Sequence, residues 1–428
     1  MITSETTKKI ASNTVYQLIG KLVSMSVTIL VTVIITRAYG REGYGEFNIM
    51  QTFPALFFII VDFGLNAIAT RELSTDWAKA KQYLANILLY RIVLSFIVMA
   101  ISGMLLVFFP YSSSLKLGIL LSLFLILVQS LYATTNIIFQ VKLRYDFSTI
   151  GLICGSLMIL ALVLVLSYFK ASVVWIAFTY VLGGFLTFVL NLLFIRGKLG
   201  VPISLGFDKS LFKFLFWQSL PLGLMFIFSQ INFKIDSIFV SILPLPKWLG
   251  LSNIESVGVY GLPYKIFEVS LVIPTFFMNS AYPVLVKHML EGKERLKSTF
   301  NRVLVFLAFG GILFGLIGIL LSPLLIKLIG GSDFSGSVLV LQILLGGLVV
   351  FYSTQPISWL IVTLGGQKYL PVVYLISAVF NVLANLLIIP IYSFYGSAVV
   401  TIVSELIILI LLAYFARKVW RQKYAYQA

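Results

Sequence analysis

Four basic side chains, Lys21, Arg91, Lys234 and Lys265, lie inside long apolar stretches of this 428-residue sequence. A Lys or Arg at the centre of a bilayer costs about 2.5 to 3.5 kcal/mol, so four of them facing lipid would cost roughly 10 to 14 kcal/mol. That is comparable to the stability of a whole folded domain, so the four must face protein or water. Basic groups that face water within the membrane could form charge-assisted hydrogen bonds with an anionic ligand. Arg37, at the end of the first apolar stretch, is a fifth candidate.

Acidic residues share these stretches and open a second interpretation. A buried carboxylate can titrate in use, so each is a candidate for carrying a coupling proton or sodium ion: Asp62, Asp236, Glu268 and Glu405. Alternatively the charges form structural ion pairs, which would join Lys21 or Arg91 to Asp62 and Lys265 to Glu268. Lys234 and Asp236 are two positions apart and point to different faces of a helix, so they are poor mutual partners. The sequence leaves both interpretations open.

The composition identifies a polytopic membrane protein and excludes several other classes. Hydrophobic residues make up 60% of the chain and charged residues 11%, and the mean hydropathy is +1.04. The net charge of +16 does not indicate nucleic-acid binding, because no soluble domain with a basic face exists. One cysteine, Cys154, and one histidine, His288, exclude a disulfide framework and a metal cluster of these residues. With no P-loop and no nucleophile–base arrangement either, we expect no enzyme, no metal and no cofactor.

Stretches of spanning length recur twelve times. A helix rises 1.5 Å per residue and must cross a hydrocarbon core of roughly 30 Å. The predicted spans cover residues 12–38, 44–68, 83–109, 114–140, 147–169, 172–195, 213–243, 256–286, 299–326, 337–364, 369–391 and 396–416. The first run follows Lys8 and Lys9 and is too long for a cleaved signal peptide, so we interpret it as the first span. An even number of spans places both termini on one side.

The basic residues of the connections give the orientation. With the N-terminus inside, 21 Lys and Arg residues fall on the inner side and six on the outer side. Cytoplasmic loops retain positive charge, so we expect both termini to be cytoplasmic.

A connection with three helix-disfavouring residues, Gly200, Pro202 and Gly206, divides six spans from six. We therefore place an N-terminal six-helix lobe at residues 1–203 and a C-terminal lobe at 204–428. Weak internal similarity supports a repeat, because Tyr16-Gln17 resembles Trp217-Gln218 and Tyr44-Gly45 resembles Tyr260-Gly261. The predicted fold is all-α, with two lobes related by a pseudo-twofold axis along the membrane normal and a central cleft between them.

The first two spans are predicted to form a helical hairpin. The turn between them runs from Thr36 to Gly45 and contains three glycines. Gly40 lies where a helix C-terminal cap requires a residue that tolerates positive φ, and Gly43 and Gly45 are expected to let the chain reverse.

The hairpin carries a family resemblance. The sequences TRAYGREGYGEFNIMQTF and DFGLNAIATREL resemble the N-terminal signature of the Wzx-type polysaccharide repeat-unit flippases, which are bacterial O-antigen and capsule transporters. These flippases belong to the multidrug/oligosaccharidyl-lipid/polysaccharide exporter superfamily. In that superfamily spans one, two, seven and eight line the central cleft, so the resemblance places Lys21, Lys234 and Lys265 on cleft-lining spans.

The resemblance implies a flippase of the bacterial inner membrane. Its cargo would be an undecaprenyl-diphosphate-linked oligosaccharide repeat unit, moved from the inner to the outer leaflet by alternating access for O-antigen and lipopolysaccharide synthesis. The bilayer, the polymerase and the chain-length proteins would be its partners. The expected substrate-binding residues are Lys21, Arg37, Arg91, Lys234 and Lys265.

Two rivals remain. A cation-coupled multidrug exporter of the same superfamily would have an acid-dominated cleft, whereas basic and acidic residues within spans number four each here. A membrane-embedded polysaccharide polymerase would need a sizeable outer loop, and no outer connection much exceeds about a dozen residues.

Overall fold

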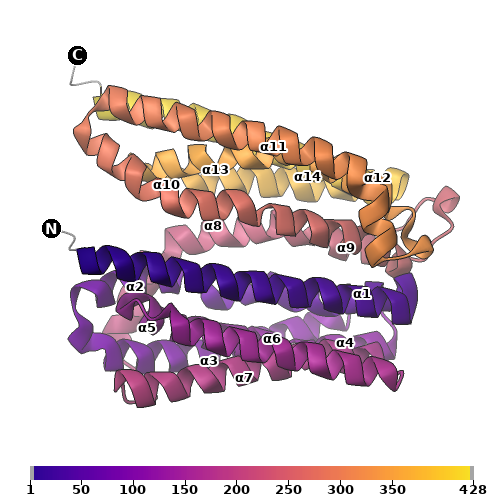
Figure 1. The fold of residues 1–428 in the computed structure, drawn as a ribbon. Coiled ribbons are helices and arrows are strands. Elements are labelled where there is room, and N and C mark those ends of the chain that lie inside the picture. Colours follow the sequence, from indigo (N-terminus) through magenta and orange to yellow (C-terminus); the bar gives the residue numbers. More distant parts are fainter. Residues whose placement is uncertain (1–3, 425–428) are drawn as a thin grey trace. The chain divides into compact units, whose positions relative to one another are not determined.

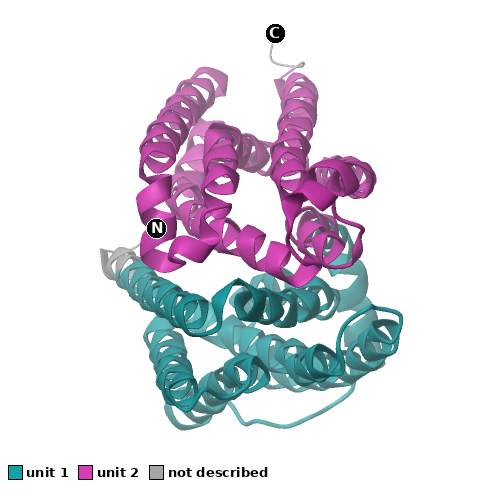
Figure 2. Cartoon of the chain, turned by 90° about the vertical axis from the view of Figure 1, so that its right-hand side faces the viewer, with its two compact units in different colours: residues 1–227 teal, residues 228–428 magenta. Residues whose placement is uncertain are grey.

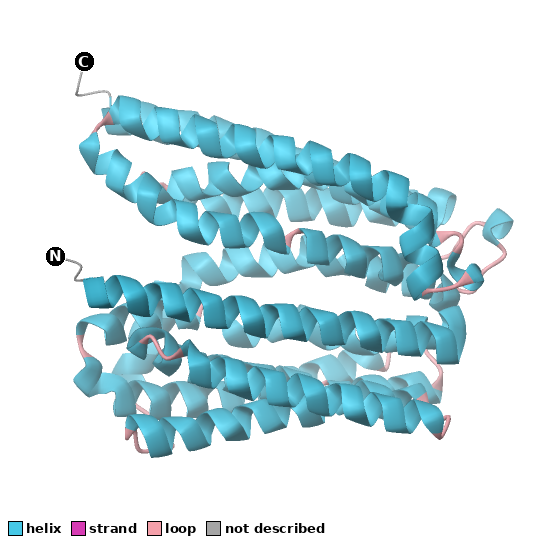
Figure 3. Cartoon of the chain, in the orientation of Figure 1, coloured by secondary structure: helices cyan, strands magenta, loops and turns pink. Residues whose placement is uncertain are grey.

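The computed structural model describes residues 4–424, with side chains from residue 12 onward. The predicted basic side chains of Lys8 and Lys9 lie outside the described side chains. Within the described residues the chain forms helices joined by turns and short loops, without a strand (Figure 3). The expected all-helical membrane fold is confirmed.

The helices fall into two compact units, Met1–Ile227 and Phe228–Ala428, which are coloured separately in Figure 2. Unit 1 contains α1 (Ser4–Asp62), α2 (Leu65–Thr75), α3 (Ala80–Leu106), α4 (Ser113–Ser122), α5 (Phe124–Lys142), α6 (Tyr145–Tyr168) and α7 (Val173–Leu199) (Figure 1). Helix α8 (Lys209–Ile242) begins in unit 1 and ends in unit 2. Unit 2 continues with α9 (Asn253–Ser270), α10 (Val272–Glu291), α11 (Lys293–Ile329), α12 (Ser337–Gly346), α13 (Leu348–Thr363) and α14 (Leu370–Tyr424). Short 3₁₀ turns lie at Trp77–Lys79, Lys247–Leu249, Ser332–Phe334 and Gln367–Tyr369.

Ten helical stretches among the described residues are long and apolar enough to cross a membrane. Two of them, Ser12–Thr75 with 64 residues and Gln367–Tyr424 with 58, are far longer than one crossing needs. At 1.5 Å per residue each would extend roughly 90 Å, about three times the thickness of a hydrocarbon core. A single non-helical residue interrupts α1 in the first stretch and α14 in the second, so both helices are helical hairpins. Counting each hairpin as two crossings is consistent with the twelve predicted spans.

The first hairpin turns at Gly40, whose φ of 65° and ψ of −164° leave the helix. On one side of the turn, the Tyr39 hydroxyl donates to the carbonyl of Ala171 at 2.7 Å, and Thr149 Oγ1 donates to the carbonyl of Tyr16 at 2.9 Å. The first arm of α1 therefore runs alongside α6, whereas the second arm returns to place Asp62 against α3. The predicted hairpin and the positive φ of Gly40 are present in the structure.

The roles predicted for Gly43 and Gly45 in the turn are wrong. Both are buried and already helical, and neither has a positive φ. Gly43 is small for a packing reason, because a Cβ there would lie 2.4 Å from Cβ of Tyr39. One glycine is enough to reverse the chain.

Helices α6 and α7 pack through glycine, which lets their backbones touch. A Cβ built on Gly155 would lie 2.5 Å from the carbonyl oxygen of Gly183, and one built on Gly183 would lie 2.7 Å from the carbonyl oxygen of Gly155. Thr187 Oγ1 adds a hydrogen bond across the interface to the carbonyl of Gly151 at 3.2 Å. Small residues and interhelical hydrogen bonds are the usual basis of helix association in lipid.

The connection before α8, residues 200–208, is attached to α3 by hydrogen bonds. The side chain of Asp208 accepts hydrogen bonds from the amides of Ser210 and Leu211, which caps α8, and from Gln82 Nε2 at 3.0 Å. The amide of Asp208 donates to Asn86 Oδ1 at 2.5 Å. These bonds fix the first turn of α8 in unit 1.

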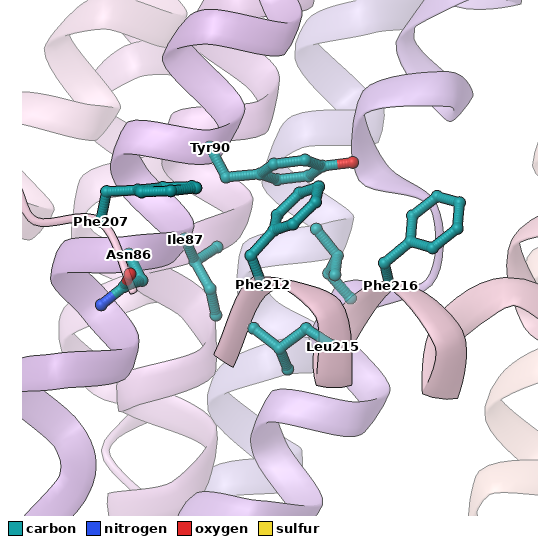
Figure 4. A pocket seen from close by; sticks show the side chains of 8 residues that line it. Asn86, Ile87, Tyr90, Phe207, Phe212, Leu215 and Phe216 are labelled. Carbon is teal, nitrogen blue, oxygen red and sulfur yellow. The ribbon is translucent and has the colours of Figure 1, made fainter. Parts of the chain in front are cut away.

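An aromatic cluster reinforces this attachment. Figure 4 shows Phe207 and Phe212 beside Tyr90 of α3, around a small apolar pocket. Further along α8, Phe216 stacks on Phe63, with ring centroids 5.5 Å apart. Phe63 and Gly64 both have positive φ and break the second span between α1 and α2. The predicted lobes meet at residues 203 and 204, whereas unit 1 extends to Ile227 because this first half of α8 packs on it.

The second hairpin, α14, breaks at the buried Ser393, with φ of 50° and ψ of −145°. Its two arms are joined by polar side chains: Ser397 Oγ donates to Asn385 Oδ1 at 2.7 Å, and Asn381 Nδ2 donates to Ser404 Oγ at 3.0 Å. The break falls between the two predicted spans, which end at 391 and resume at 396.

Candidate functional site

Two lysines and one glutamate form a charged cluster inside the spans of unit 2. Lys265 Nζ donates to Glu268 Oε2 at 2.9 Å, and Lys234 Nζ donates to Glu268 Oε1. The protein leaves 20% of the Lys234 side chain, 36% of Lys265 and 27% of Glu268 uncovered. Two ammonium groups sharing one carboxylate leave a formal charge of +1, so the cluster is a partly accessible cationic site.

The helices explain how the cluster forms. Lys265 and Glu268 are three positions apart on α9, which places them on the same face. Lys234 reaches Glu268 from α8, and its ammonium also lies 5.9 Å from the ring centroid of Tyr264. The pairing of Lys265 with Glu268 was one of the ion pairs that the sequence left open. The pairing of Lys234 with Glu268 was missed, because spacing along one chain does not show which turns of two helices lie side by side.

Asp236 lies close to this cluster along α8, fully buried. Its Oδ2 accepts hydrogen bonds from the Tyr260 hydroxyl at 2.5 Å and from Thr401 Oγ1 at 3.5 Å, and its Oδ1 accepts from the amide of Ser237. These partners come from α8, α9 and α14 of unit 2. Among the described side chains no Lys or Arg lies within ion-pair distance of Asp236, as expected for a residue two positions from Lys234.

Glu405 is the second buried carboxylate of unit 2, with 8% of its surface uncovered. It accepts a hydrogen bond from Thr354 Oγ1 at 2.5 Å. In the part of the chain with described side chains it too has no basic partner. A buried carboxylate is costly when charged and unpaired, so Glu405 lacks the compensation that two ammonium groups give to Glu268.

Unit 1 holds a different arrangement around Arg91, whose side chain is completely buried. One nitrogen, Nη2, donates to Asp62 Oδ1 at 2.6 Å and to Asn66 Oδ1 at 3.0 Å. The other, Nη1, donates to Thr134 Oγ1 at 2.8 Å and to the carbonyl of Ser130 at 3.0 Å. The guanidinium thus joins α1, α2, α3 and α5. This geometry corresponds to the ion-pair interpretation, in which Asp62 pairs with Arg91 and not with Lys21.

The remaining predicted residues, Lys21 and Arg37, lie on the first arm of α1, where both side chains are exposed. Within one unit the structure brings together only Lys234 and Lys265 from the five predicted substrate-binding residues. Of the four predicted coupling carboxylates, Asp62 and Glu268 have basic partners, whereas Asp236 and Glu405 have hydroxyl partners.

The described residues contain no group of three or more His, Cys, Asp or Glu side chains arranged to hold a metal ion. His288 lies near the end of α10, where its Nδ1 is 2.6 Å from Thr299 Oγ1 of α11. Cys154 has no cysteine to pair with, since it is the only one in the chain.

Comparisons with protein families and with solved structures place the chain among known proteins. Residues 10–289 match the family described as polysaccharide biosynthesis protein. No curated protein matches significantly.

Among solved structures, an inward-facing multidrug resistance MATE family transporter of the MOP superfamily superposes with a TM-score of 0.76. The alignment has 14% identity and covers 95% of this chain and 96% of the transporter. The lipid II flippase MurJ in an inward closed conformation superposes with a TM-score of 0.74 and 14% identity, covering 96% of this chain and 89% of MurJ. A MOP superfamily transporter from Pyrococcus furiosus gives a TM-score of 0.67 and 15% identity, covering 98% and 96%.

The structural matches establish a shared fold, and the sequence match extends over well more than half of the chain. The chain therefore belongs to the polysaccharide biosynthesis protein family and has the fold of the MATE and MurJ transporters.

Proposed function

We propose that the protein is a flippase that carries a polyprenyl-diphosphate-linked oligosaccharide repeat unit from the inner to the outer leaflet of the bacterial plasma membrane, with both termini in the cytoplasm. The observation that carries the proposal is the cationic cluster of Lys234, Lys265 and Glu268 within the spans of unit 2. Membership of the polysaccharide biosynthesis family supports a glycan-linked cargo. The similarity to a lipid II flippase supports a lipid-linked one.

The cluster suits a diphosphate for electrostatic reasons. A diphosphate attached to a sugar carries about two negative charges, and its transfer out of water requires donors that replace its hydration. An ammonium group has three donors, and Lys234 uses one of them on Glu268. The carboxylate keeps both ammonium groups in place and reduces the cost of holding them in the membrane before cargo arrives. An incoming diphosphate would then meet a net positive site of fixed geometry.

The other predicted residues take different parts in the proposal. Arg91, buried on four acceptors, holds the helices of unit 1 together without touching cargo. Lys21 and Arg37, both exposed, are proposed to contact the headgroup during its passage. Asp236 and Glu405 are the better-placed coupling groups, because they lack the permanent basic partners that Asp62 and Glu268 have.

The test is complementation of a flippase-deficient strain that carries the matching glycan pathway, with surface glycan measured at equal expression. We expect Lys234→Ala and Lys265→Ala to lose most surface glycan and Lys234→Arg to retain it. Lys368→Ala is the matched control, since Lys368 lies in the 3₁₀ turn before α14 and not in the cluster.

Full export by both cluster variants would refute the cationic-cluster mechanism. A wild-type protein that exports no glycan but confers resistance to cationic drugs would instead be an exporter. Export by the Lys21→Ala and Arg37→Ala variants at the wild-type level would remove these two residues from the cargo path.

A further inference from the structure

Unit 1 contains a partly open cavity of about 190 Å³ that the functions proposed above do not use. Its walls come from α1, α5, α6 and α7. Polar side chains from all four helices line it, among them Ser24, Gln129, Tyr132, Ser156 and Thr187, and aliphatic residues and glycines complete the walls. None of the lining side chains is charged.

Three polar groups in this cavity have no hydrogen-bond partner among the described residues: the Gln129 amide and the hydroxyls of Tyr132 and Ser156. Ser156 is buried, with only 6% of its surface uncovered, whereas the Gln129 and Tyr132 side chains are half-buried at the open side of the cavity. Buried polar groups in native proteins are almost always hydrogen-bonded to protein, ordered water or ligand. The cavity thus offers donors and acceptors that remain to be satisfied by an occupant.

The chemistry of the walls selects the occupant. A diphosphate or a metal ion is disfavoured, because nothing here would compensate a charge. A purely apolar chain would leave the amide and the hydroxyls without hydrogen-bond partners, which is unfavourable. A neutral molecule with both hydroxyl groups and apolar faces satisfies amide, hydroxyl and aliphatic surfaces together, and the rings of Tyr132 and Tyr180 offer flat surfaces for such a face.

The size agrees with a single sugar ring. One water needs about 10 to 15 Å³ of such space, so the cavity accommodates roughly a dozen heavy atoms. Its walls are also stiff, because α6 and α7 touch through Gly155 and Gly183, and the cavity cannot collapse by bringing these helices closer together.

We propose that this cavity, the unit 1 sugar pocket, binds one uncharged sugar residue of the transported glycan through Gln129, Tyr132 and Ser156. The inference rests on the proposed flippase function and adds a glycan-reading subsite within unit 1 to the cationic cluster of unit 2. The lipid diphosphate would provide the part of the affinity that is common to all cargoes. The sugar pocket would distinguish cargoes by their glycan.

The test measures binding of two probes to the purified full-length protein in lipid nanodiscs: undecaprenyl diphosphate, and the same lipid carrying one neutral sugar. We expect the wild type to bind the sugar-bearing lipid more tightly. Ser156→Leu, which fills the cavity, and Gln129→Leu, which removes its amide, should weaken that binding roughly five- to tenfold and leave binding of the sugar-free lipid unchanged. Ser156→Ala is the matched control, because it keeps the space open and should lose less.

The outcomes separate this inference from the proposed function. If Lys234→Ala weakens both probes while Ser156→Leu and Gln129→Leu bind both like the wild type, the flippase proposal stands and the cavity holds only water. Equal wild-type affinity for the two probes also overturns the sugar pocket. If the wild type binds neither probe, both proposals fail.

A second measurement does not depend on how well the Leu variants fold. In a Cys154→Ser background, Ser156→Cys places a single thiol in the cavity, and the sugar-bearing lipid should slow its alkylation whereas the sugar-free lipid should not. The native protein is the control, because its only thiol, Cys154, is not part of the cavity wall. Equal alkylation rates with both lipids would refute the proposal.

Discussion

The buried pair of Arg91 and Asp62 allows a direct test of whether this cation is structural. The variants are Arg91→Met, Asp62→Leu and the double variant that carries both. Each single change removes one member of the pair, and the double change replaces both members with apolar side chains of similar volume. The Arg91 side chain is completely covered, whereas 18% of the Asp62 side chain is not.

The magnitude follows from what each change leaves behind. Removing one partner of a buried pair costs about 3 to 5 kcal/mol, because the other charge is left uncompensated, whereas replacing both with apolar groups is often neutral. Asp62→Leu should be the more damaging single change, because it leaves a completely covered guanidinium uncompensated, whereas Arg91→Met leaves a carboxylate of which 18% is uncovered. For a unit of this size, a loss of that order lowers the unfolding midpoint by about 6 to 20 °C.

The assay is thermal unfolding of the purified variants in one detergent, followed by export of surface glycan. We expect the double variant to recover most of the midpoint that the single variants lose, and to export glycan. A double variant that is as unstable as Asp62→Leu would refute the structural account of the pair. A double variant that is stable but exports nothing would show that Arg91 contacts cargo.

Three further predictions concern the backbone and the connection to α8. Ser393→Gly should raise the unfolding midpoint for two reasons. It relieves a φ of 50°, which costs about 1 to 3 kcal/mol for a residue with a side chain, and it removes a buried hydroxyl that has no hydrogen-bond partner. An unchanged or lower midpoint would contradict this prediction. Gly183→Ala should reduce the free energy of unfolding by about 1 to 3 kcal/mol, because its Cβ would lie 2.7 Å from the carbonyl oxygen of Gly155. A variant as stable as the wild type would show that α6 and α7 can separate. Asp208→Ala should expose residues 200–208 to protease at neutral pH. Hydrogen bonds from the Leu211 amide and its neighbours hold the pKa of Asp208 below its ordinary value of 3.8. The contribution of Asp208 to stability is therefore present above about pH 3.8 and is lost as the pH falls through the lower pKa of the folded state. Equal cleavage of variant and wild type at neutral pH would contradict the proposed attachment of this connection to α3.

Much of the fold could be predicted because the membrane constrains it strongly. Apolar length predicted the spans, and the need for a positive φ predicted the turn at Gly40. The equivalent break at Ser393 could be placed only by the lengths of the flanking spans, because serine gives no signal for that conformation. The break at Phe63 and Gly64 was missed, although glycine readily adopts the positive φ of Gly64; the stacking of Phe63 on Phe216, far away in the sequence, could not be predicted.

The charged residues were easier to find than to pair. Their positions in apolar spans identified Lys234, Lys265 and Glu268 as candidate functional residues. The spacing of three along one helix suggested the ion pair of Lys265 with Glu268. The other pair depends on the rotation of α8 against α9, which hydrophobic periodicity does not determine for helices that are apolar on all sides. The sugar pocket was missed for a related reason, because serine, glutamine and tyrosine in a span resemble ordinary interhelical hydrogen-bonding residues until a cavity shows otherwise.

The attachment of the first half of α8 to α3 has a consequence for producing the protein as two separate polypeptides. A cut between Pro202 and Leu205 would follow the apparent midpoint of the chain. The second fragment, however, would carry Asp208, Phe212 and Phe216 near its start, and their partners belong to the first fragment. Two polypeptides divided there and produced together in one cell should therefore associate, through the contacts of the first half of α8 with unit 1.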